Sequence, residues 1–117
     1  SVDMLISNCR VGALSHTGEV KLELSLDSKG NLVGSYYEGG ILTSSETIPA
    51  SGVLVSCTIG SATLTLSSAT TLALSFDRVT GAQKAQPDGS MCTAIRFESS
   101  RSYTIELVPS TGSHKLV

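Results

Sequence analysis

The chain has 117 residues, enough for one domain with one hydrophobic core and too few for two ordinary domains, so we expect a single domain over residues 1–117. A composition of 40% hydrophobic and 15% charged residues excludes an intrinsically disordered chain. The formal net charge of -2, the lack of a basic run and the few aromatic rings argue against nucleic acid as a partner.

Two features bear on where the protein works. No stretch approaches the roughly 18 apolar residues of a membrane helix, so we expect no membrane span. Few lysines, abundant serine and threonine, and strand-like patterning favour an extracytoplasmic location, either secreted or periplasmic.

The first patterned segment is MLISNCRV, residues 4–11. We interpret it as the first strand, with Leu5, Cys9 and Val11 on one face. No window of the sequence shows a sustained period of 3.6, so no long helix is expected.

The segment EVKLELSLD, residues 19–27, has the clearest pattern in the chain. Its strict alternation of apolar and polar residues is typical of a half-buried strand. The inward residues are Val20, Leu22, Leu24 and Leu26. Residues 27–30 have the composition of a hairpin turn, in which Asp27 pairs with Asn31 and so sets the register of the next strand.

Two adjacent tyrosines occupy that second strand. Neighbouring strand residues point to opposite faces, so Tyr36 and Tyr37 cannot share one environment. In the register set by the turn, Tyr36 lies opposite Leu22 in the core, and Tyr37 points outward beside Lys21. We therefore expect Tyr36 to be buried and Tyr37 to be exposed.

The segment ILTSSETI, residues 41–48, is a weaker strand that Pro49 ends. We interpret it as an edge strand. An unpaired edge can add a strand from another chain, so a homodimer through this edge is one hypothesis.

The rest of the chain continues the alternating pattern. Residues 51–68 predict two strands joined at Gly60 and Ser61, and residues 70–77, 91–98 and 102–108 predict three more. A long polar connection covers residues 77–90. The residues expected to face inward are Val53, Val55, Cys57, Ile59, Ala62, Leu64, Leu66, Leu72, Leu74, Phe76, Met91, Thr93, Ile95, Phe97, Tyr103, Ile105 and Leu107.

Together these segments predict an all-β fold. We expect a single antiparallel domain of about 7–9 strands, which is either a small meander barrel or a β-sandwich. The sequence leaves both architectures open.

The three cysteines are Cys9, Cys57 and Cys92, so at least one has no partner within the chain if a disulfide forms. Strand parity places Cys9 and Cys57 inward and Cys92 outward. A Cys9–Cys57 disulfide is therefore favoured over a bridge to Cys92, and Cys92 is expected to react first with thiol reagents. The alternative is that all three are reduced.

Catalytic motifs are scarce in this sequence. The two histidines, His16 and His114, lie in a turn-like segment and a terminal tail, and neither belongs to a motif. The sequence contains no Cys-x-x-Cys pair, no cluster of cysteine and histidine, and no glycine-rich loop that opens a helix, so we expect no metal or cofactor.

Four residues are candidates for binding. Tyr37 is expected to be an exposed aromatic residue beside Lys21, and tyrosine is enriched at protein interfaces. The loop over residues 79–90 is long enough to be functional and contains Lys84 and Asp88.

Three functional hypotheses follow, in descending order. The first is a non-enzymatic extracytoplasmic module that recognises another protein, as an inhibitor, an adhesin component or an accessory domain. The second is a small lipocalin-like barrel that holds an apolar ligand among Leu22, Leu24, Tyr36 and Phe76. The third is a hydrolase of unrecognised type.

Overall fold

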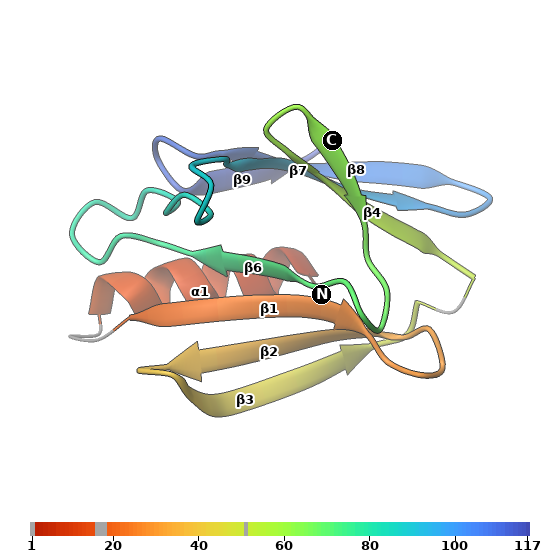
Figure 1. Ribbon diagram of the computed structural model, residues 1–117, viewed down its shortest axis with the longest axis horizontal. Coiled ribbons are helices and arrows are strands. Elements are labelled where there is room, and N and C mark those ends of the chain that lie inside the picture. The colour runs from red at the N-terminus through yellow and green to blue at the C-terminus, as the bar shows by residue number, and fades with distance from the viewer. Residues whose placement is uncertain (1, 16–18, 51) are drawn as a thin grey trace.

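The structure is a computed structural model that describes residues 2–15, 19–50 and 52–117, without the side chain of residue 3. One helix and nine antiparallel strands lie in these ranges (Figure 1). The elements are α1 (Val2–Ser15), β1 (Val20–Leu26), β2 (Leu32–Glu38), β3 (Ile41–Ile48), β4 (Leu54–Ile59), β5 (Ala62–Thr65), β6 (Leu72–Ser75), β7 (Cys92–Glu98), β8 (Ser102–Val108) and β9 (Ser113–Leu116). The expected antiparallel all-β class is confirmed.

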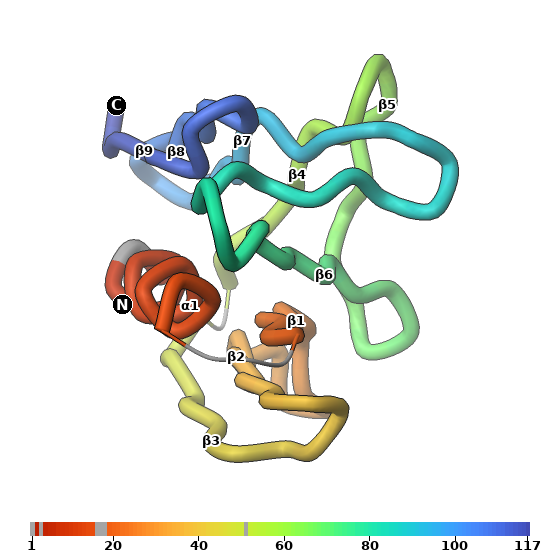
Figure 2. The backbone as a smooth tube through the Cα atoms, turned by 90° about the vertical axis from the view of Figure 1, so that its left-hand side faces the viewer, coloured from red at the N-terminus to blue at the C-terminus, as the bar shows by residue number. Residues whose placement is uncertain are grey.

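The strands form two sheets. The first sheet has the order β3-β2-β1-β6, and the second has the order β5-β4-β7-β8-β9. The sheets face each other, and α1 lies beside the gap between them (Figure 2). No helix in the described ranges has the length and hydrophobicity to cross a membrane.

The small-barrel alternative is wrong because the strands divide between two separate sheets that do not close on each other. The interior expected to hold an apolar ligand is occupied by packed side chains. Leu22, Leu24 and Phe76 are buried in the core, and Tyr36 packs against them while partly buried.

The strand expected over residues 4–11 is also wrong, because these residues lie within α1. The buried residues of the helix are Val2, Ile6, Cys9 and Ala13. Their spacing of three or four residues puts them on one helical face, whereas Val11, expected to share a face with Cys9, is 62% exposed. This apolar stripe packs against β1, β2, β6 and β9.

The β1–β2 hairpin has the register that the sequence predicts. Leu22 lies opposite Tyr36, and Lys21 lies opposite Tyr37. The Asp27 amide donates to the Asn31 carbonyl at 2.9 Å, and one Asp27 carboxylate oxygen accepts the amides of Lys29 and Asn31. This carboxylate stabilises the turn and so fixes which residues of β2 face the core.

The start of β7 departs from simple alternation. Thr58 pairs with Ala94, but the next residue of β4, Ile59, pairs with Cys92, which leaves Thr93 as an extra residue in a β-bulge. The bulge reverses the parity upstream of Ala94. Cys92 is therefore buried and Thr93 exposed, the opposite of the orientation expected for both.

Most of the other residues expected in the core are buried there, in a single cluster that spans both sheets and α1. Partly buried residues at its edge include Leu26, Val53, Ile59 and Leu64. Tyr103 and Ala62 share the inward face with their partners Phe97 and Ile59, as expected, but Tyr103 is 48% exposed and Ala62 is exposed at the end of the β4–β5 hairpin. Met91, expected to face inward, is only partly buried and is not part of this cluster.

Arg10 ties the helix to two connections that are distant in sequence. Its Nε atom donates to the Gly81 carbonyl at 3.2 Å, and its Nη2 atom donates to the Thr111 carbonyl at 2.9 Å. Gly112 sits directly under this contact, with φ of 75°. A Cβ atom at position 112 would collide with the Gly81 carbonyl oxygen.

The prediction from this contact compares two glycines that both have positive φ. Gly112→Ala should lower the free energy of unfolding by about 3 kcal/mol, because the strain of positive φ adds to a backbone collision. Gly89→Ala, with φ of 87° and open space around the new methyl, should cost only about 1 kcal/mol. Urea unfolding measures both, and equal losses would contradict the packing of residues 81 and 112.

Candidate functional site

The outward face of the first sheet brings together residues that the sequence singled out. Lys21 pairs with Ser75 of β6 on one side and with Tyr37 of β2 on the other, and Tyr37 pairs in turn with Leu42 of β3. Directly paired residues share a face of a sheet. Ser75, Lys21, Tyr37 and Leu42 thus form one row across all four strands, which we call the outward row.

Lys21 and Tyr37 form the centre of the outward row. The Lys21 ammonium lies 4.8 Å from the centroid of the Tyr37 ring, within range of a cation–π contact, and 3.6 Å from the Glu23 carboxylate. Tyr37 is partly exposed. Exposed pairs of these kinds each contribute at most about 1 kcal/mol, so the arrangement orients the two side chains without holding them rigidly.

The connection over residues 77–90 packs against the fold at several points. Gln83 is buried, and its side-chain amide exchanges two hydrogen bonds with the backbone of Cys92, at 2.8 and 2.9 Å. The Lys84 amide donates to the Ser75 carbonyl at 2.8 Å, which places Lys84 beside the β6 end of the outward row. Gln86 donates from Nε2 to the Ala73 carbonyl at 2.8 Å.

Asp88 has a different environment from the other three candidate residues. Its carboxylate accepts the Ser90 hydroxyl at 2.6 Å and the Ser90 amide at 3.0 Å, and these bonds lower the pKa of Asp88. The carboxylate thus stabilises its own turn, and Asp88 does not line the hollows beside the outward row.

Two open hollows flank Lys21. One, of about 370 Å3, is lined by Glu19, Lys21, Tyr37 and the turn glycines Gly39 and Gly40. The other, of about 350 Å3, is lined by Glu19, Lys21, Ala73, Ser75, Lys84, Ala85, Gln86 and Pro87. Three of the four candidate residues, Tyr37, Lys21 and Lys84, therefore line adjoining hollows on one surface.

The strand β3 is an edge of the first sheet, as the sequence predicts. Its residues are exposed up to Thr47, and Ile41 and Leu42 are 72% and 53% exposed. Thr43 is skipped in the pairing with β2, so a bulge interrupts the strand near its start. Five residues of regular edge remain after it, with Glu46 as the only charged side chain.

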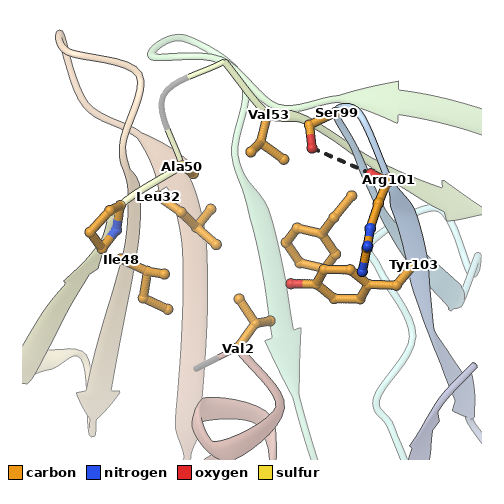
Figure 3. A pocket seen from close by; sticks show the side chains of 10 residues that line it. Val2, Leu32, Ile48, Ala50, Val53, Ser99, Arg101 and Tyr103 are labelled. Atoms are coloured by element: carbon orange, nitrogen blue, oxygen red, sulfur yellow. Dashed lines mark hydrogen bonds between the residues drawn. The ribbon is translucent and has the colours of Figure 1, made fainter.

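A separate pocket of about 130 Å3 lies at the end of the two-sheet core, where α1 begins (Figure 3). We call it the end pocket. Its lining residues are Val2, Leu32, Ile48, Pro49, Ala50, Val53, Phe97, Ser99, Arg101 and Tyr103. The rings of Phe97 and Tyr103 stack, with centroids 4.8 Å apart and an interplanar angle of 15°.

All three cysteines are reduced and buried. The favoured Cys9–Cys57 disulfide is therefore absent, because it assumed that Cys9 lies on a strand, whereas Cys9 lies on α1. Burial raises the pKa of the Cys9 thiol to about 12. A hydrogen bond with Cys92 lowers the pKa of Cys57 against the opposing effect of burial, and the same bond and burial raise the pKa of Cys92.

One of the two histidines, His114, has a different position from that expected. His114 belongs to β9, opposite Leu107, and so is part of the sheet and not of a loose tail. His16 lies outside the described residues. Within the described ranges, no three residues among His, Cys, Asp and Glu are grouped so that they could hold a metal ion.

Comparisons with models of protein families, with curated proteins and with solved structures give no significant match.

Sequence reasoning missed two features of these sites. Leu42 was not singled out, although its place in a weak strand beside Tyr37 marked it as an uncovered apolar residue. The end pocket could not be found from the sequence, because its lining residues come from α1, from both sheets and from the connections that follow β3 and β7.

The burial of the thiols leads to a prediction. Because each cysteine residue is at most 1% exposed, all three thiols should resist alkylation in the native protein and react together when denaturant unfolds it. Mass-mapped alkylation at increasing urea concentrations measures this. Labelling of Cys92 below the unfolding transition would contradict the bulge that turns this residue inward.

The two adjacent tyrosines lead to a second prediction. Tyr36→Ala should lower the free energy of unfolding by about 2–4 kcal/mol, because the ring packs on the core. Tyr37→Ala should cost less than about 1 kcal/mol, because only the contact with Lys21 is lost. Thermal unfolding of both variants tests this, and a large loss for Tyr37→Ala would show that its ring has a structural role.

Proposed function

We propose that the protein is a non-enzymatic, extracytoplasmic binding module that takes up an extended segment of another protein as an additional strand against β3. The observation that carries this proposal is the uncovered edge of the first sheet: β3 is exposed over residues 41–47 and presents apolar side chains. The extracytoplasmic location rests on the composition of the chain.

Strand addition has two physical components at this edge. Main-chain hydrogen bonds to the free edge of β3 supply affinity, and they extend over the regular part that follows the bulge at Thr43. Natural edge strands are usually protected by charged side chains, proline, a bulge or a covering segment, and β3 has the bulge at Thr43 and one charged residue, Glu46. Residues 44–48 contain neither lysine nor proline, and only Ile48 among them is partly covered.

Specificity would come from the outward row. Leu42 is 53% exposed and lies beside Tyr37, so an added strand meets an aliphatic and an aromatic side chain next to the edge. The ammonium of Lys21 follows across the sheet. This combination of an aromatic anchor with a flanking cation is typical of protein interfaces and favours a partner with apolar and acidic side chains.

A peptide selection tests the proposal. Random ten-residue peptides displayed on phage are selected on the wild-type protein, and the enriched peptides are titrated against variants. Leu42→Ser should weaken their binding by about tenfold, because it removes an apolar contact at the edge. The matched control is Val108→Ser, which removes a 42% exposed apolar side chain from β8 and should leave binding unchanged.

Hydrogen exchange identifies the mode of binding. The bound peptide should protect alternate amides of residues 44–48, because only every second amide of an edge strand points away from its neighbour. If the same amides become protected with rising protein concentration and no peptide, the partner is a second copy of the chain. Peptides that bind Leu42→Ser as tightly as wild type and protect no β3 amide would refute the proposal.

A further inference from the structure

The end pocket is distinct from the surface proposed to bind a protein. Its walls come from the inward faces of both sheets, whereas the outward row lies on the opposite face of the first sheet. Leu32 and Ile48 contribute from β2 and β3, and Phe97 and Tyr103 from β7 and β8. The first residue of α1, Val2, lines the pocket from the helix.

The pocket has the size and lining for one small apolar group. Its volume is about 130 Å3, and an apolar cavity of about 150 Å3 can hold a benzene molecule. The buried part of the wall consists of apolar side chains, among them Leu32, Ala50 and Phe97. Such a surface holds water poorly, so an apolar ring gains free energy by entering it.

Among the described residues that line the pocket, the charged one is Arg101. Arg101 is exposed, so the pocket reaches the surface beside its guanidinium. Figure 3 shows the Arg101 side chain running beside the ring of Tyr103, whose hydroxyl points toward the pocket. Among the described residues, the guanidinium has no ion-pair partner. The nearby carboxylate of Glu98 already pairs with Arg96, at 2.7 Å.

We infer that the end pocket binds a small apolar carboxylate of about the size of benzoate, with its ring between Leu32 and Phe97 and its carboxylate at Arg101. A guanidinium binds a carboxylate through charge-assisted hydrogen bonds, which are stronger than neutral ones. None of the described residues that line the pocket has an acidic side chain that would repel the ligand. The volume restricts the ligand to a single ring or a short branched chain.

An NMR titration with benzoate tests this inference on the intact protein, with the methyl groups of leucine, isoleucine and valine labelled. Benzoate should shift the resonances of Leu32, Ile48 and Val53, which line the pocket. Benzamide has the same shape without the charge and should bind about tenfold more weakly, because it cannot make the charge-assisted bond to Arg101.

Arg101→Gln tests the polar part of the site and Ala50→Leu the apolar part, with Lys84→Gln as the control. Arg101→Gln should weaken benzoate about tenfold and abolish the preference over benzamide. Lys84→Gln removes the same charge from the other surface and should leave benzoate binding unchanged. Ala50→Leu should fill the pocket and abolish binding of both compounds; if this variant does not fold, the comparison between Arg101→Gln and Lys84→Gln decides.

Several results would overturn the inference. These are equal affinity for benzoate and benzamide in the wild-type protein, unchanged binding by Arg101→Gln, or no shift at Leu32, Ile48 and Val53 up to the solubility limit of benzoate. Leu42→Ser should not affect benzoate binding, so failure of the proposed protein-binding function and failure of this inference are distinguishable.

Discussion

The packing of α1 into the open side between the two sheets is the interaction on which the rest of this structure depends. Ile6 and Cys9 are fully buried against the strands, and their burial closes a core that two sheets alone would leave open to water. The helix and β2 approach closely at two glycines, Gly12 of α1 and Gly34 of β2. A Cβ atom at Gly34 would collide with Leu5, and one at Gly12 would collide with the Tyr36 hydroxyl. Arg10 adds a polar connection to the loops around Gly81 and Thr111.

The position of the helix also explains where the two candidate sites lie. Because α1 covers the inward face of β1, β2 and β6, the outward row on the opposite face remains available, and β3 stays exposed at the edge. The end pocket forms where the helix begins. Val2 is its first residue, and it lines the pocket together with Leu32 and Phe97. The packing of α1 therefore leaves both the outward row and the end pocket accessible.

The β1–β2 hairpin and the β7 bulge show where the alternation of apolar and polar residues predicts the face of a side chain correctly and where it does not. Between residues 19 and 38 the register was predictable, because the Asp27 turn and the leucine face are both local features and agree with each other. At Cys92 the same reasoning was wrong. An extra residue in β7 reverses the side-chain parity, and a bulge depends on the strand opposite, here β4, about which residues 91–98 carry no information.

The sequence by itself determined the antiparallel strands, the face of each residue in the first hairpin, the edge position of β3 and the outward placement of Tyr37 beside Lys21. These follow from period-two patterns and turn residues, which act over a few positions. Only the tertiary structure decided that residues 2–15 form a helix, that Cys92 is buried, that Lys84 lies beside the outward row and that a pocket exists at Arg101. Each of these depends on contacts between segments distant in the chain, and the burial energy that selects among them does not exist until those segments meet.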